Sequence, residues 1–319
     1  MIEYNDIIKT GNARLDKINF PVDTKNIEVY LKREDLIHPA VSGNKWYKLK
    51  HNLIHARRQK YNTLLTFGGA FSNHIYAVAA AGNIFGFNTI GLIRGEKHAP
   101  LNPTLKFATE HGMRLIYIDR TSFKRKNEED FRKNICKQFG NVYILPEGGT
   151  NEFAVTGVAE IVDSIKADYD YLCCSCGTGG TIAGLIKGTG GNKKILGFSA
   201  LKGGDFLKHD VRNLLSGDAG ELKNWKINLN YHFGGYAKIN LELINFVIEF
   251  ERINKIVLDY IYTGKMMYGL YDLIKAGYFE EGSRIIAIHT GGVQGNLGMN
   301  ERKDKILKRS GNEDLKICK

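Results

Sequence analysis

The chain has 319 residues, 43% of them hydrophobic, so it can bury one large core or two cores of ordinary domain size. Apolar runs fall short of the roughly 20 residues that span a membrane, and the start, MIEYND, carries acids where a signal peptide carries bases. We therefore expect a cytoplasmic protein without a membrane partner. The net charge of +11 does not indicate a nucleic-acid partner, because acids are interspersed among the bases.

Short apolar runs alternate with helical patterns along the chain. Strands are predicted at residues 64–67, 89–93, 115–118, 142–145, 171–174, 195–198 and 285–288, and helices at residues 76–81, 153–165 and 241–251. This alternation predicts an α/β fold of parallel sheets covered by helices. We expect a large domain of residues 1–50 and 158–319 and a small domain of residues 51–157.

The cysteines predict neither disulfides nor a metal site. Cys136, Cys173, Cys174, Cys176 and Cys318 are sparse for this length, and three of them share one predicted strand. Cys173 and Cys176 form a CxxC pair, but no second Cys or His pair stands at zinc-ligand spacing from it. Buried structural thiols are therefore the expected outcome.

Three predicted strands end in glycine-rich turns, at residues 68–74 (GGAFSNH), 176–181 (CGTGGT) and 289–295 (HTGGVQG). Ligands of open parallel sheets bind at the carboxyl ends of strands, so these turns are expected to share one cleft. The second turn precedes a helical pattern, and its glycines, threonine hydroxyls and helix N–H groups suit a phosphate. A tight turn without a ligand is the alternative, since the motif lacks both the P-loop ending and GxGxxG spacing.

Six motifs occur in order between residues 31 and 298: KRED, SGNKWYKLK, GGAFSNH, CGTGGTIAG, YTGK and HTGG. Together they resemble the pyridoxal-phosphate-dependent family that contains D-cysteine desulfhydrase and 1-aminocyclopropane-1-carboxylate (ACC) deaminase. The resemblance implies a fold like that of the tryptophan synthase β-subunit (fold type II), with two open parallel-sheet domains around a cofactor cleft. It also implies that the large domain binds pyridoxal 5'-phosphate and that the protein is a homodimer.

By this resemblance, Lys45 holds the cofactor through its amine, as a Schiff base. A lysine in a cleft lined by Trp46 and Tyr47 can lose its proton through desolvation, as this role requires. The alternative is a solvated lysine in a basic helix with Lys48 and Lys50.

The first and second turns are expected to bind the rest of the cofactor and the substrate. Asn73 matches the family asparagine that hydrogen-bonds the cofactor ring oxygen. Ser72 matches the neighbouring serine, which contacts the substrate. Both can instead be ordinary N-caps, while His74 lies at the same helix start and receives no acid–base role. The phosphate is assigned to Cys176, Gly177, Thr178, Gly179, Gly180 and Thr181.

Two tyrosines and two threonines complete the implied site. Tyr236 and Tyr262 match positions that face cofactor and substrate, and a phenol with a lowered pKa can transfer a proton. Thr263 stands where the deaminase pattern has a glutamate that faces the pyridine nitrogen. Thr290 stands where that pattern has a leucine. A hydroxyl only hydrogen-bonds a largely neutral nitrogen, whereas a carboxylate keeps it protonated. A further departure is Tyr260, where the family usually has proline.

Opening a cyclopropane needs the stronger electron sink, so the two threonines favour β-elimination. We therefore predict a lyase of amino-acid metabolism that converts D-cysteine to pyruvate, ammonia and sulfide, with Lys45 or Tyr262 taking the α-proton. ACC deaminase, a hydrolase that yields 2-oxobutyrate and ammonia, is the first alternative. A non-catalytic protein that binds phosphate or nucleic acid is the second.

Overall fold

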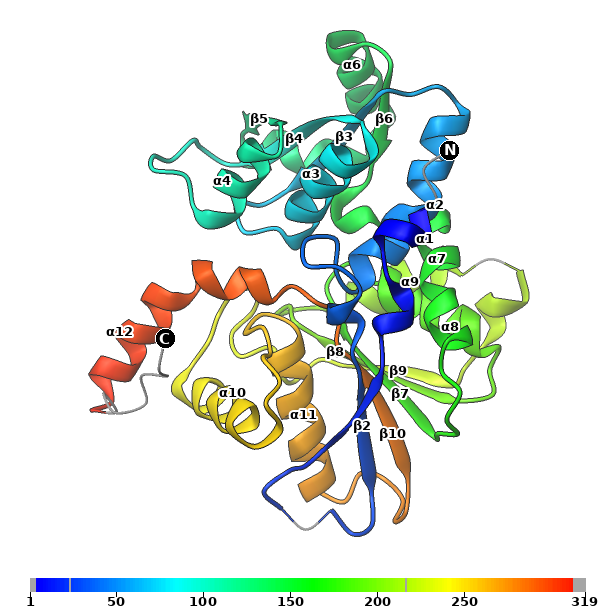
Figure 1. The fold of residues 1–319 in the computed structure, drawn as a ribbon, viewed down its shortest axis with the longest axis vertical. Helices are drawn as coiled ribbons and strands as arrows, with labels where there is room; N and C mark the ends of the chain where they lie inside the picture. Colours follow the sequence, from blue (N-terminus) through cyan, green and yellow to red (C-terminus); the bar gives the residue numbers. More distant parts are fainter. Residues whose placement is uncertain (1–3, 23, 216, 312–319) are drawn as a thin grey trace.

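The computed structural model describes residues 4–22, 24–215 and 217–311, which fold around two sheets (Figure 1). The larger sheet has the order β1-β2-β10-β7-β8-β9, and the smaller has the order β5-β4-β3-β6. Every strand pair is parallel except β1 with β2 at one edge. The larger sheet contains β1 (Leu15–Ile18), β2 (Glu28–Lys32), β7 (Tyr171–Cys176), β8 (Lys194–Ser199), β9 (Trp225–Asn228) and β10 (Arg284–Ile288). The smaller contains β3 (Thr63–Gly68), β4 (Asn88–Arg94), β5 (Met113–Ile118) and β6 (Val142–Leu145).

These sheets confirm the predicted α/β fold class and all seven predicted strands, whose bounds agree within two residues. Strands β1, β2 and β9 were not predicted. The sequences of β1 (LDKI) and β9 (WKIN) are half polar, because each lies at a sheet edge and is only partly buried.

Helices cover both faces of each sheet. Leu64 and Leu65 are successive residues of β3 and therefore point to opposite faces. Leu64 packs in the core that α3 and α4 share, and Leu65 packs in a separate core with residues of α5 and α6. The helices in the described residues are α1 (Tyr4–Ile7), α2 (Asn44–Arg58), α3 (Asn73–Phe85), α4 (Pro103–Glu110), α5 (Arg120–Lys124), α6 (Glu129–Phe139), α7 (Glu152–Asp163), α8 (Gly180–Thr189), α9 (Phe206–Leu214), α10 (Leu241–Asn254), α11 (Thr263–Lys275) and α12 (Asn300–Arg309).

The chain passes between the sheets through α2 and returns through α7 (Figure 1). These two helices pack so closely that a side chain at position 157 of α7 would overlap the carbonyl oxygen of Tyr47 in α2. Only glycine, Gly157, allows this approach. The expected domain boundaries, after residues 50 and 157, fall inside these helices, so the domain division stays a prediction.

All three glycine-rich turns follow the carboxyl ends of strands, namely β3, β7 and β10. Cys173, Cys174 and Cys176 are buried free thiols of β7 and Cys136 is an exposed free thiol, whereas Cys318 lies outside the described residues. Within the described ranges, no helix is both long and apolar enough to cross a membrane.

Candidate active site

A cavity of about 630 Å³ lies where the turns that follow both sheets meet. Its wall combines the residue 69–74 turn, the start of α2, the residue 175–181 turn and Thr290. Of the residues singled out in the sequence, the wall contains Lys45, Ser72, Asn73, His74, Cys176, Gly177, Thr178, Gly179, Thr181, Tyr236, Tyr262 and Thr290. Gly180 and Thr263 are not among its lining residues.

Lys45 lies in the first turn of α2, which is brought against the β10 turn by Gly43. A side chain on Gly43 would overlap the carbonyl oxygen of Thr290, and its φ of +62° also favours glycine. Lys45 Nζ donates to Asn44 Oδ1 at 3.1 Å. Burial lowers the pKa of Lys45 to about 8, against the attraction of Asp259. At pH 7 about a tenth of this amine is therefore unprotonated, far more than for an ordinary lysine, as a nucleophilic lysine requires.

The turn before α8 leaves backbone N–H groups open to the cavity. Gly179 is the N-cap of α8, has a φ of +79°, and supplies no side-chain cap. A Cβ atom on Gly180 would lie 2.8 Å from Thr150 Oγ1, and one on Gly177 would lie 3.1 Å from the Tyr262 ring. Only glycines fit there, and the open helix terminus with its neighbouring threonines fits a phosphate group.

Lys48 also faces this turn, although no role was predicted for it from the sequence. Its side chain is buried, and Nζ donates to the Gly148 carbonyl and to Thr150 Oγ1, each at 3.1 Å. Burial and the neighbouring Lys45 ammonium hold the pKa of Lys48 well below its ordinary value. Its position three residues after Lys45, on the same face of α2, is the signal that could have identified it.

The residue 69–74 turn presents capping and ligand-binding groups together. Ser72 caps α3 by accepting the Ile75 amide at 3.3 Å, and Asn73 Oδ1 accepts from Gln294 Nε2 at 3.2 Å. Both side chains still line the cavity, so capping does not exclude ligand contact.

His74 is a buried, neutral imidazole of the same wall. Thr66 Oγ1 donates to the Leu145 carbonyl at 3.0 Å, so at 2.9 Å it accepts the Nε2 proton of His74. Its Nδ1 then carries a lone pair that has no hydrogen-bond partner in the described part of the chain. Burial, with Lys45 and Lys48 nearby, keeps the pKa of His74 well below its ordinary value. A contact of this nitrogen with substrate stays a prediction.

Tyr236 and Tyr262 form an edge-to-face pair with ring centroids 6.2 Å apart. Burial raises the pKa of Tyr262 well above its ordinary value, and Tyr236 and Asp259 add to the rise. The condition under which a tyrosine removes a proton, a lowered pKa, is therefore not met, because burial and the neighbouring Asp259 keep the phenol protonated. Tyr262 is suited to donate a proton or a hydrogen bond, and not to remove a proton.

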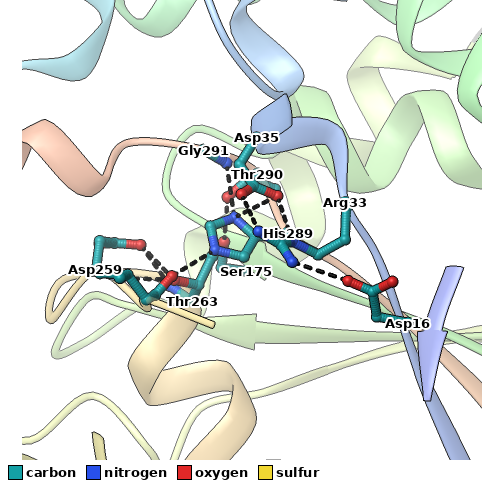
Figure 2. Close-up of polar contacts among 10 residues, drawn as sticks. Asp16, Arg33, Asp35, Ser175, Asp259, Thr263, His289, Thr290 and Gly291 are labelled. Atoms are coloured by element: carbon teal, nitrogen blue, oxygen red, sulfur yellow. Dashed lines mark hydrogen bonds and ion pairs between the residues drawn. The ribbon is translucent and has the colours of Figure 1, made fainter. Parts of the chain in front are cut away.

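The expected role of Thr263 needs correction. Its side chain is fully buried, and its hydroxyl donates to Asp259 Oδ1 at 2.7 Å and accepts from the Asp259 amide at 3.0 Å (Figure 2). The Asp259 carboxylate also accepts the amides of Ile261, Tyr262 and Thr263. The Thr263 hydroxyl therefore holds the turn before α11 and does not face the cavity.

Thr290 does line the cavity, beside a serine that sequence reasoning missed. The hydroxyl oxygens of Thr290 and Ser175 lie 3.4 Å apart, and both residues are on the wall (Figure 2). Ser175 stands between Cys174 and Cys176 in β7 and shows no motif of its own. Among the described lining residues the acids are Glu147 and Asp210, which belong to other segments of the wall. This part of the cavity therefore offers hydroxyl groups and no carboxylate.

Comparisons with known proteins agree with this site. The family model for pyridoxal-phosphate-dependent enzymes matches residues 9–291. A Pyrococcus furiosus protein with the provisional name 1-aminocyclopropane-1-carboxylate deaminase is 31% identical, with 88% of each chain covered. The bifunctional D-cysteine desulfhydrase/1-aminocyclopropane-1-carboxylate deaminase of Arabidopsis thaliana, a mitochondrial protein, is 30% identical over 92% of this chain and 79% of its own.

A solved structure described as an ACC deaminase homologue superposes with a TM-score of 0.80 at 27% identity, covering 93% of this chain and 94% of the other. The fold-type II architecture expected from the motifs is thus confirmed. The comparisons support the expected lyase description and not the hydrolase one. The chain belongs to the pyridoxal-phosphate-dependent enzymes, in the family of ACC deaminases and D-cysteine desulfhydrases, and pyridoxal phosphate is its cofactor.

Proposed function

We propose that this enzyme catalyses β-elimination from a small D-amino acid, with D-cysteine as the substrate. The observation that carries the proposal is the pair of hydroxyls, Thr290 and Ser175, in a part of the cavity without a carboxylate. We assign these hydroxyls, in place of Thr263, to the pyridine nitrogen. A hydroxyl leaves that nitrogen largely neutral, which suffices for a substrate with a good leaving group.

The cofactor, when bound, supplies a carbonyl carbon for the substrate amine and a ring that draws electrons from Cα. Its phosphate would be held by the turn before α8 and by Lys48, the buried cation beside that turn. Ser72 and Asn73, at the start of α3, would hold the substrate carboxylate.

Lys45 is the residue that takes the Cα proton, since its amine has a lowered pKa and lines the cavity. The Cβ–S bond then breaks and the sulfur leaves as thiolate, for which the protonated Tyr262 hydroxyl is a proton donor. Hydrolysis of the resulting enamine gives pyruvate and ammonia. Tyr236 packs against Tyr262 and fixes the ring that bears this hydroxyl.

Deamination of ACC is the second candidate, because the names of the Pyrococcus and Arabidopsis relatives favour it equally. A product assay on the purified holoenzyme separates the two. D-cysteine, L-cysteine, β-chloro-D-alanine and ACC are supplied in turn, and pyruvate, sulfide and 2-oxobutyrate are measured. If D-cysteine gives pyruvate and sulfide and L-cysteine does not, the result supports the proposal. If ACC gives 2-oxobutyrate and D-cysteine gives no sulfide, the enzyme is an ACC deaminase and the proposal is wrong.

The homodimer, the cytoplasmic location and the division into domains stay predictions from the sequence. Sedimentation velocity of the holoenzyme tests the first of these.

A further inference from the structure

Two cations of the described cavity wall are not used by the proposed reaction. Arg94, the last residue of β4, and Lys126, in the turn that follows α5, both line the cavity. Lys126 is paired with Glu147, also on the wall, at 3.2 Å. The Arg94 guanidinium, in contrast, forms no hydrogen bond or ion pair with any residue that the structure describes. Arg94 is thus the uncompensated positive charge of this part of the wall.

The Arg94 side chain is exposed and lies against an aromatic ring. Its guanidinium carbon lies 5.5 Å from the ring centroid of Phe123, a buried residue that also contacts Lys126. Its Nη2 atom would lie 3.5 Å from a Cβ atom on Gly69, so this glycine leaves the guanidinium room beside the residue 69–74 turn. The exposed guanidinium thus has an aromatic ring on one side and the residue 69–74 turn on the other, and its five N–H donors are available at the wall.

The surroundings place this charge near the substrate. Gly69 begins the turn that carries Ser72 and Asn73, the residues assigned to the substrate carboxylate. Burial raises the pKa of Tyr236, and the positive charge of the Arg94 guanidinium opposes that rise. Arg94 is therefore close enough to the tyrosine pair to act on it electrostatically, and it lies beside the carboxylate-binding turn. Asp210, the remaining acid of the described wall, lies instead on α9, next to Val211, which packs against Gly179.

We propose that Arg94 binds a second anionic group of the substrate, carried on its β-substituent, in addition to the α-carboxylate. The inference rests on the proposed β-elimination from small D-amino acids and adds, beside D-cysteine, substrates that carry a carboxylate, sulfonate or phosphate on the side chain. Arginine suits all three anions because its planar guanidinium donates two parallel hydrogen bonds.

D-aspartate and D-asparagine test this inference, since they are nearly equal in size and differ in side-chain charge. Binding of each to the holoenzyme is measured by isothermal titration calorimetry. We expect D-aspartate to bind about tenfold more tightly, as one charge-assisted pair in a partly exposed site provides. Arg94→Gln removes this preference and leaves D-asparagine binding within about twofold, while Arg94→Lys keeps part of it. Lys97→Gln, an exposed cation three residues along that is not among the lining residues, leaves both affinities unchanged.

Equal binding of the two amino acids to the wild-type protein overturns the inference. If Arg94→Gln weakens the binding of D-aspartate and of D-asparagine equally, the inference is also overturned, because Arg94 then binds the α-carboxylate that the two share. Sulfide release from D-cysteine is measured on the same preparations. If sulfide is released from D-cysteine but D-aspartate is not bound preferentially, the proposed function stands and the inference is rejected. If D-aspartate is bound preferentially but no sulfide is released, the Arg94 site is supported and D-cysteine elimination is rejected.

Discussion

His289 Nε2 lies 2.8 Å from the carbonyl oxygen of Val257, and this bond joins two segments that form the cavity wall. His289 Nδ1 accepts the Gly291 amide at 3.2 Å, so Nε2 is the ring nitrogen that donates to Val257. Val257 precedes the turn that carries Tyr262, and Gly291 follows Thr290. One buried imidazole therefore fixes the backbone on both sides of the site.

Replacing this imidazole should destabilise the protein and loosen both segments. His289→Ala leaves the Val257 carbonyl and the Gly291 amide without their partner in a buried region, which costs about 1–3 kcal/mol for each group. The free energy of unfolding, from urea denaturation of the cofactor-free protein, should fall by about 2–4 kcal/mol. His209→Ala, on the exposed face of α9, is the control and should change it by less than about 0.5 kcal/mol. A similar small change for His289→Ala would contradict this role.

Lys45→Ala should abolish turnover while the fold is retained, because the reactive amine is removed from a half-buried position. We expect the rate to fall by at least 100- to 10,000-fold, about the contribution of one proton-transfer group. Lys50→Ala is the matched control, since Lys50 pairs with Glu160 at 2.6 Å and is not a lining residue. Borohydride reduction of the holoenzyme followed by peptide mapping should place the cofactor on Lys45. A label on Lys48 or Lys265 would show that the assignment is wrong.

Lys48→Met should weaken cofactor binding, because it removes the buried cation beside the turn that precedes α8. Loss of one charge-assisted hydrogen bond to the phosphate, about 1.5–3 kcal/mol, corresponds to a loss of affinity of roughly 10- to 150-fold. Titration of the cofactor-free protein with pyridoxal phosphate measures this. Lys50→Met should leave the affinity unchanged. Equal affinity of Lys48→Met and wild type would mean that Lys48 only bridges Gly148 and Thr150.

The lowered pKa of Lys45 predicts how cofactor binding depends on pH. The unprotonated amine is the nucleophile, so its fraction, and with it the rate of covalent cofactor attachment, rises as pH increases through about 8. Stopped-flow absorbance of the cofactor-free protein mixed with pyridoxal phosphate gives this profile. A midpoint near the ordinary lysine value of 10.5 would contradict the desolvated position of Lys45.

The strands that form the interior of the sheets were predictable because burial on both faces leaves a continuous apolar signal, as in residues 171–174. Strand β2 was not predicted because its sequence, EVYLK, has a charge at each end and runs directly into the charged KRED segment, and charges are expected outside. Here Lys32 and Glu34 are buried with their charged atoms 3.5 Å apart, and Tyr47 donates to Glu34 at 2.8 Å. Only the folded chain brings such partners together.

The motifs located most of the cavity wall, but they did not give side-chain directions. Thr263 follows Tyr262 in the YTGK motif, yet its hydroxyl is held by Asp259, four residues earlier. Ser175 reaches the wall because side chains of β7 alternate between its two faces. Lys45 and the glycine-rich turns of the wall were therefore predictable from sequence, whereas the places of Lys48 and Ser175 and the direction of each hydroxyl were not.

The hydroxyl character of the cavity beside Thr290 and Ser175 is tested most directly by the protonation state of the cofactor ring. Nitrogen NMR of the holoenzyme reconstituted with pyridoxal phosphate labelled with ¹⁵N in the ring distinguishes neutral pyridine from pyridinium. A resonance in the range of neutral, hydrogen-bonded pyridine is predicted for the wild-type protein at neutral pH. A pyridinium resonance would contradict the assignment of hydroxyl partners and remove the physical basis for preferring β-elimination over ACC deamination.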